Sequence, residues 1–145
     1  MRVLVCGGRD FANINPHKKD DLSLSQYRFV RSVLANFTNR FSKEWSLWDN
    51  WLPTDITIIS GAAKGVDSAA IDYAISDFLP FEEYPADWDQ YGKGAGYIRN
   101  QQMLDTGIDL VVAFPGGRGT ADMVRRAKKA GVEVLEVYYD CTQAN

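Results

Sequence analysis

Short apolar runs alternate with helix-like segments along most of the chain. Apolar runs of roughly 4–8 residues that stop at Gly, Ser or Pro are typical of strands buried on both faces of a sheet. They predict strands at residues 3–6, 56–59, 81–84, 109–114 and 132–137, of which the third is the weakest. Apolar residues at three- and four-residue steps are typical of amphipathic helices. They predict helices at about residues 25–41, 65–77, 97–105 and 120–130.

Strands that alternate with helices predict an α/β fold, here a Rossmann-like three-layer sandwich around a mostly parallel five-stranded sheet. We expect the strand order 3-2-1-4-5 and a single domain over residues 1–145. In such sheets a ligand binds beyond the carboxyl ends of the strands, where the winding reverses. The loops after Cys6, Ile59 and Phe114 are therefore expected to matter for function, and they are rich in glycine.

A Trp-rich insertion at about residues 42–54 falls outside this plan, with Trp45, Trp48 and Trp51 at three-residue steps. One interpretation is an amphipathic helical turn whose indoles cover the core. A second is a subunit interface, where Trp is enriched, which would make the protein a homo-oligomer. A third is an aromatic lid over a ligand.

Composition and charge exclude several function classes. The 145 residues include 16 basic and 19 acidic side chains, for a net charge of −3, and the isoelectric point is about 5.1. A domain that binds nucleic acid through a basic face more typically has an isoelectric point above ~9, so no nucleic-acid partner is expected. No apolar stretch approaches the ~18 residues of a membrane span. The first residues also lack the apolar core of a secretory signal, so we expect a cytoplasmic protein without a membrane partner.

Cysteine and histidine are too scarce for most metal or nucleophilic sites. The chain has two cysteines, Cys6 and Cys141, and one histidine, His17. A zinc site normally takes four Cys and His ligands in close pairs, so neither a metal nor another cofactor is expected. A Ser-His-Asp or Cys-His mechanism would have to use His17, which lies in a polar stretch. Cys6 lies in an apolar run and is expected to be buried.

The loop after Phe114 is the most informative about function. Its glycines let the backbone approach a ligand, and the helix behind it presents unpaired N–H groups to an anion. The alternative is that the glycines serve only a sharp turn. The binding candidates here are Pro115, Gly116, Gly117, Gly119 and Thr120, whose hydroxyl can also cap the helix. The P-loop motif is absent and the G-x-G-x-x-G pattern fails at Asp122, so a P-loop ATPase and an NAD dehydrogenase are not expected.

Further binding candidates lie in three other segments: Gly7, Gly8 and Arg9; Ser60, Gly61, Lys64, Gly65 and Asp67; and Asp87, Trp88, Arg99 and Asn100. The basic side chains can bind a phosphate, and Arg9 can instead pair with an aspartate. Asp67 can accept from a ligand hydroxyl or simply favour the helix dipole. Trp88 can stack on a base or pack under its loop. Loops of small residues after three strands favour a nucleotide-like ligand that bears phosphate.

These motifs resemble the YspA-like branch of the SLOG superfamily, Rossmann-like proteins related to the Lonely Guy phosphoribohydrolases and to DNA-processing protein A. The resemblance rests on residues 7–10, 61–67, 85–88, 91–92, 95–100 and 113–120, and spans nearly all of the chain except about residues 36–53. Members of this branch often occur in bacteria and their phages. The resemblance implies a SLOG domain whose pocket takes a nucleotide derivative.

One position departs from the Lonely Guy pattern P-G-G-x-G-T-x-x-E, whose glutamate takes part in cleaving the N-glycosidic bond of a nucleotide. Met123 occupies the glutamate position and has no acid–base chemistry. Asp122 lies one residue earlier, about 100° away around a helix. Arg99 matches the arginine of that chemistry. The phosphate-binding loop is thus present without the family's catalytic carboxylate, which leaves the protein's status as an enzyme open.

Two functions remain for a chain of this kind. The first is a binding module that senses or sequesters a nucleotide-derived molecule; a phage-borne copy would then act in counter-defence as a sponge. The alternative is a hydrolase of a nucleotide N-glycosidic or phosphoester bond, with catalytic candidates Arg99, Asp67 and Asp122, and with Asp10 and Asp87 as further candidate acids. Single-stranded DNA binding, by analogy with DNA-processing protein A, is disfavoured by the acidic isoelectric point.

Overall fold

The computed structural model describes residues 1–14, 21–46 and 56–140. Within them the sheet has five strands, all neighbouring pairs are parallel, and the order is β3-β2-β1-β4-β5. The strands are β1 (Arg2–Cys6), β2 (Thr57–Ser60), β3 (Phe81–Glu83), β4 (Leu110–Ala113) and β5 (Glu133–Glu136). The α/β fold class and the strand order predicted from the sequence are therefore confirmed.

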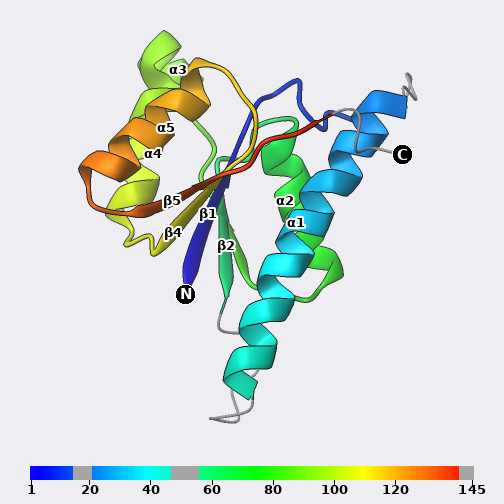
Figure 1. Ribbon diagram of the computed structural model, residues 1–145. Coiled ribbons are helices and arrows are strands. Elements are labelled where there is room, and N and C mark those ends of the chain that lie inside the picture. The colour runs from blue at the N-terminus through cyan, green and yellow to red at the C-terminus, as the bar shows by residue number, and fades with distance from the viewer. Residues whose placement is uncertain (15–20, 47–55, 141–145) are drawn as a thin grey trace.

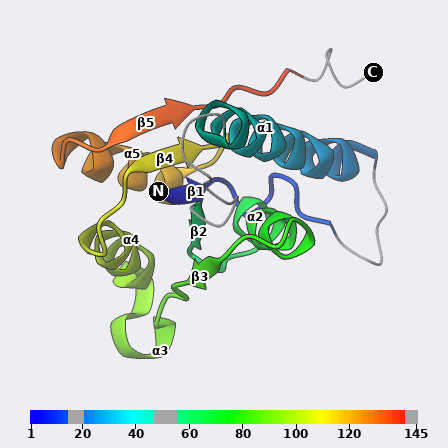
Figure 2. The same ribbon diagram turned by 90° about the horizontal axis from the view of Figure 1, so that it is seen from below.

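Helices cover both faces of this sheet. One face carries α1 (Asp21–Ser46) and α2 (Val66–Ser76), and the opposite face carries α4 (Ala95–Asp105) and α5 (Arg118–Lys129), as Figures 1 and 2 show. The short helix α3 (Trp88–Tyr91) and the 3-10 turn η2 (Gly92–Gly94) lead from β3 into α4. This is the three-layer arrangement expected for a Rossmann-like domain.

The central strands supply side chains to two separate cores. Val3 and Val5 of β1 point to the α1–α2 side, where Leu34 of α1 is also fully buried. Leu4 points to the α4–α5 side and packs in the same cluster as Met123 of α5. Because successive side chains of a strand face opposite sides of the sheet, a strand covered on both faces needs a continuous apolar run. This is why the sequence pattern predicted β1, β2 and β4 well.

Several helix boundaries differ from the predicted ones. Helix α1 extends beyond the predicted residues 25–41 at both ends, so the first residues of the predicted insertion continue this helix. Helix α5 begins at Arg118 because Gly117 occupies the N-cap position, so the suggestion that Thr120 caps this helix is wrong. Helix α3 was not predicted. Asp87 caps it by accepting from the backbone N–H of Gln90 at 3.1 Å, as N-cap carboxylates do.

The prediction of a Trp-rich interface or lid falls on the side chain of Trp45 and on Trp48 and Trp51, which lie outside the described residues. His17 and Cys141 lie outside them as well. Among the described helices, none combines the length and the apolar character needed to cross a membrane.

Candidate functional site

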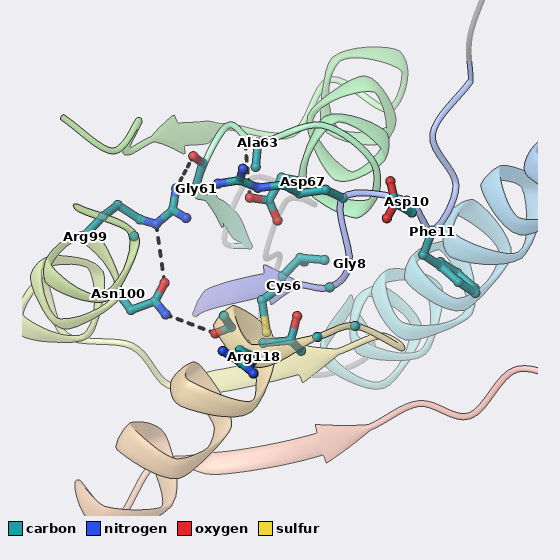
Figure 3. A pocket seen from close by; sticks show the side chains of 18 of the residues that line it. Cys6, Gly8, Asp10, Phe11, Gly61, Ala63, Asp67, Arg99, Asn100 and Arg118 are labelled. Carbon is teal, nitrogen blue, oxygen red and sulfur yellow. Dashed lines mark hydrogen bonds between the residues drawn. The ribbon is translucent and has the colours of Figure 1, made fainter. Parts of the chain in front are cut away.

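A cleft of about 730 Å³ lies at the carboxyl edge of the sheet, between the loops that follow β1, β2 and β4 and the start of α4 (Figure 3). This is where parallel α/β sheets bind ligands. The structure brings thirteen of the predicted binding residues to its walls: Gly7, Gly8, Arg9, Gly61, Asp67, Trp88, Arg99, Asn100, Pro115, Gly116, Gly117, Gly119 and Thr120.

Four predicted binding residues lie outside the lining of this cleft. Ser60 is fully buried and holds the turn after β2, because its hydroxyl donates to the backbone carbonyl of Asp67 at 3.1 Å. Lys64 and Gly65 border a separate hollow on the α1 side of that turn. Asp87 caps α3. Ser60 and Asp87 thus have local structural roles.

The loops after β1 and β4 lie against each other at the centre of the cleft. The backbone N–H of Gly8 donates to the carbonyl of Pro115 at 2.9 Å. A Cβ at Gly116 would lie 2.7 Å from the Gly8 nitrogen and 2.2 Å from the hydroxyl of Thr120. Gly116 is therefore required by close backbone packing, and the steric explanation of this glycine is sufficient.

Gly117 and Gly119 have a different environment. A Cβ at either position would meet no heavy atom within 4 Å. Both are exposed, and both line the cleft at the first turn of α5, which no side chain caps. Packing does not explain these two glycines. Their missing side chains instead leave open space beside unpaired helix N–H groups, the arrangement that favours a bound anion.

The turn after β2 is held by a glycine in the left-handed region. Gly65 has φ +79°, and a Cβ there would lie within 2.7 Å of three backbone oxygens, those of Gly8, Arg9 and Phe11. The N–H of Val66 also donates to the Gly8 carbonyl, at 3.4 Å. The loop after β1 and the start of α2 are thus in direct backbone contact, which only glycine permits at this position.

Asp67 projects from the first turn of α2 into the cleft and is 6% exposed. One carboxylate oxygen accepts from the backbone N–H of Ala63 at 3.2 Å. Burial raises the pKa of this carboxyl from 3.8 to about 6, while the Ala63 hydrogen bond and the charges of Arg99 and Arg9 oppose the rise. Burial also raises the pKa of the Cys6 thiol on the cleft floor, with a further contribution from the Asp67 charge.

Arg99 and Asn100 form the wall on the α4 side. The Arg99 guanidinium donates to the carbonyls of Gly61 and Tyr84 and, at 3.3 Å, to the side-chain oxygen of Asn100. Burial lowers the pKa of Arg99, and the charge of Asp67 opposes this effect. The Asn100 amide in turn donates to the Gly119 carbonyl at 3.1 Å, so one side chain joins α4 to the first turn of α5.

Asp122 lies outside the lining of the cleft. Its buried carboxylate accepts from Asn100 at 3.1 Å, from Arg125 at 2.6 Å and from Arg126 at 2.8 Å. Met123, at the position of the Lonely Guy glutamate, is fully buried in the core under α4 and α5. Neither side chain presents a free acid–base group to a ligand in the cleft.

Arg9 and Trp88 meet at the rim of the cleft. The guanidinium carbon of Arg9 lies 5.0 Å from the centre of the Trp88 ring, a cation–π distance. Trp88 remains 46% exposed, so its ring is partly open to solvent. An aromatic face in this position can stack on a planar group of a ligand.

Sequence reasoning missed several residues that line the cleft as binding candidates: Cys6, Phe11, Gln26 and Arg118. The position of Arg118 between Gly117 and Gly119 could have identified it, because it occupies the same helix N-terminus. Cys6 could have been identified as well, because it is the last residue of β1, next to a loop that was expected to matter. Phe11 and Gln26 had no such signal, since they approach the cleft only through the path of the loop after β1 and the packing of α1.

Comparison with known proteins identifies the family of this chain. A family model described as "YspA, cpYpsA-related SLOG family" matches residues 1–91. The chain belongs to this SLOG family. The protein is also similar to the Gene 61 protein of Mycobacterium phage D29, with 32% identity over 120 residues, 73% of this chain and 95% of that protein. No solved structure matches it.

The family assignment confirms the resemblance predicted from the sequence motifs. The matched part of this SLOG protein contains the loop after β1 with Gly8, the loop after β2, and the start of α2 with Asp67, and it ends at Tyr91. Arg99, Asn100 and the loop before α5 lie beyond it. The cleft thus combines a wall from the family-matched part with a wall from the remaining part of the chain.

Proposed function

We propose that the cleft binds a nucleotide-derived small molecule that bears phosphate, and that the protein senses or sequesters this molecule. The observation that carries the proposal is the pair Gly117 and Gly119, whose missing side chains leave space at the uncapped first turn of α5. A phosphate there would accept from helix N–H groups and benefit from the helix dipole. Membership of the SLOG family supports a nucleotide-related ligand.

The charges of the cleft support an anionic ligand. Its lining includes four cationic side chains and two carboxylates: Arg9, Lys93, Arg99 and Arg118 against Asp10 and Asp67. The exposed ring of Trp88 at the rim offers a stacking surface for a base. A volume of about 730 Å³ is that of a small-molecule site rather than a surface dimple.

Binding is favoured over hydrolysis because Met123 is buried where the related hydrolases carry their glutamate. One observation nevertheless supports the alternative of a nucleotide N-glycosidic or phosphoester hydrolase. Asp67 faces the cleft with a pKa raised to about 6, a value suited to proton transfer near neutral pH. The Arg99 guanidinium would then neutralise charge on the substrate.

The similarity to a phage protein suggests a biological setting. A phage-borne protein of this family that retains an intact nucleotide signal would lower its concentration in the host cytoplasm, and so act in counter-defence. The same proposal allows a homo-oligomer that presents several clefts.

The test is incubation of the pure protein with nucleoside monophosphates, NAD and cyclic ADP-ribose isomers, followed by mass spectrometry and thermal melting. Retention of an intact molecule with a rise in melting temperature is expected, and turnover would favour the hydrolase. Gly119→Leu should abolish the rise by filling the space at α5. Gly119→Ala is the matched control and should fold equally well, since a Cβ there meets nothing. An unchanged rise in Gly119→Leu would contradict this placement of the phosphate.

A further inference from the structure

The two ends of the cleft carry charges of opposite sign. At one end lie the N–H groups of the first turn of α5, beside Gly117 and Gly119. At the other end lies the carboxylate of Asp67, on the first turn of α2. Figure 3 shows Cys6 and Gly8 between Asp67 on one side and Arg118 on the other. A phosphate is attracted to the α5 end, whereas the Asp67 charge repels it from the α2 end.

The Asp67 carboxylate has acceptor capacity that the described protein does not use. An ionised carboxylate offers about four lone-pair sites, and within the described residues its hydrogen bond is the one from Ala63. No ion pair to Asp67 is present among these residues. The charges of Arg99 and Arg9 both act on Asp67. Arg99, however, donates to Gly61, Tyr84 and Asn100, and the Arg9 guanidinium lies over the Trp88 ring. A carboxylate this buried gains most from a ligand that brings its own donors.

Hydroxyl groups are the neutral donors that a nucleotide can present to such a carboxylate. From these two ends, and resting on the proposed function, we infer that Asp67 accepts hydrogen bonds from ribose hydroxyls and makes the cleft selective for ribonucleotides over their deoxy counterparts. The phosphate occupies the α5 end, and the sugar edge faces α2. Asp67 is thereby a specificity-determining residue, whether or not the ligand is turned over.

The proposal is tested with ligands of known chemistry: AMP, 2′-deoxy-AMP, 3′-deoxy-AMP and inorganic phosphate, each titrated calorimetrically into the wild-type protein at pH 8. Loss of one hydroxyl bonded to a charged acceptor should weaken binding by about 10- to 100-fold. Both deoxy nucleotides binding within twofold of AMP would overturn the inference. This comparison changes the ligand alone, so it does not depend on how any variant folds.

The second part of the test repeats these titrations with the variant Asp67→Asn. Its amide oxygen can still accept from Ala63, so the turn is retained, but a neutral acceptor makes a weaker hydrogen bond. The ratio between AMP and the weaker deoxy nucleotide should fall to about threefold, while the affinity for phosphate does not decrease. Asp72→Asn is the matched control, since it makes the same charge change on the same helix and should retain the wild-type ratio. A wild-type ratio in Asp67→Asn would overturn the assignment to Asp67.

The outcomes separate this inference from the proposed function. If phosphate and AMP bind and Gly119→Leu abolishes both, equal binding of AMP and the deoxy nucleotides overturns only the inference. If neither phosphate nor any nucleotide of the first test binds to the wild-type protein, the proposed function is contradicted, and the inference that rests on it fails with it.

Discussion

The side-chain amide of Asn100 donates to the carboxylate of Asp122 at 3.1 Å, and both side chains are at least nine-tenths buried. Asn100 belongs to the wall of the cleft, whereas Asp122 lies behind that wall against Arg125 and Arg126. The Asp122 carboxylate, a candidate acid in the sequence analysis, thus joins α5 to α4 through Asn100 and pairs with two arginines of its own helix.

Removal of this carboxylate should destabilise the protein. Asp122→Ala leaves the Asn100 amide and the Arg126 guanidinium without their shared acceptor, which we expect to lower the free energy of unfolding by about 2–4 kcal/mol. Urea denaturation measures the change. Arg125→Ala is the control, because a side chain that is 73% exposed should contribute less than about 1 kcal/mol. Equal stability of Asp122→Ala and wild type would contradict this support role.

Gly61→Ala should weaken ligand binding more than it weakens the fold. Its Cβ would lie 2.4 Å from a guanidinium nitrogen of Arg99 and 2.9 Å from a carboxylate oxygen of Asp67. The flexible Arg99 side chain can shift, but it then loses its place in the cleft wall. Titration with AMP should show an affinity loss of about tenfold or more. Gly94→Ala is the control: a Cβ there meets nothing and the residue lies outside the lining of the cleft, so this variant should bind as well as wild type.

Much of this arrangement could be predicted from the sequence, for physical reasons. Strands β1, β2 and β4 are covered on both faces, so their apolar runs are continuous, and glycine marks the loops that follow them. The ion pairs of Asp122 had a signal as well, since Arg125 and Arg126 follow at i+3 and i+4 on one helix. The position of Phe11 in the cleft could not be predicted from the sequence, because it depends on tertiary packing.

The stability of the ligand-free protein should depend on pH through Asp67. Its pKa in the folded protein is about 6, above the ordinary 3.8, because burial disfavours the charged form. Its contribution to stability is therefore complete below pH 3.8 and is lost as the pH rises through about 6. The charged groups around it are Arg99 and Arg9, with the Cys6 thiol nearby.

Asp67→Asn removes this titration. The variant should match the wild type near pH 4 and become more stable by up to about 3 kcal/mol at pH 8, given 1.36 kcal/mol per pKa unit. Melting temperatures over this range at low protein concentration measure the difference. A difference that stays constant with pH would show that Asp67 titrates normally.

Trp88 should contribute to nucleotide affinity without affecting phosphate affinity. Stacking of a base on an aromatic ring is worth about 1–3 kcal/mol, so Trp88→Ala should weaken AMP binding by roughly 5- to 150-fold. Calorimetric titration with inorganic phosphate is the internal control, because phosphate at α5 does not reach a stacking surface. If both ligands lose affinity equally, Trp88 supports the loop rather than the base.

The crowded backbone at Gly65 ties the loop after β1 to the start of α2. Three carbonyl oxygens converge on this residue, and the bond from Asn100 to Gly119 secures the opposite side. These contacts preorganise the described walls of the cleft. A ligand of the proposed kind would lose its own conformational freedom on binding but would require little ordering of these walls. We therefore expect fast association of such a ligand, with the lifetime of the complex determined by the strength of the contacts.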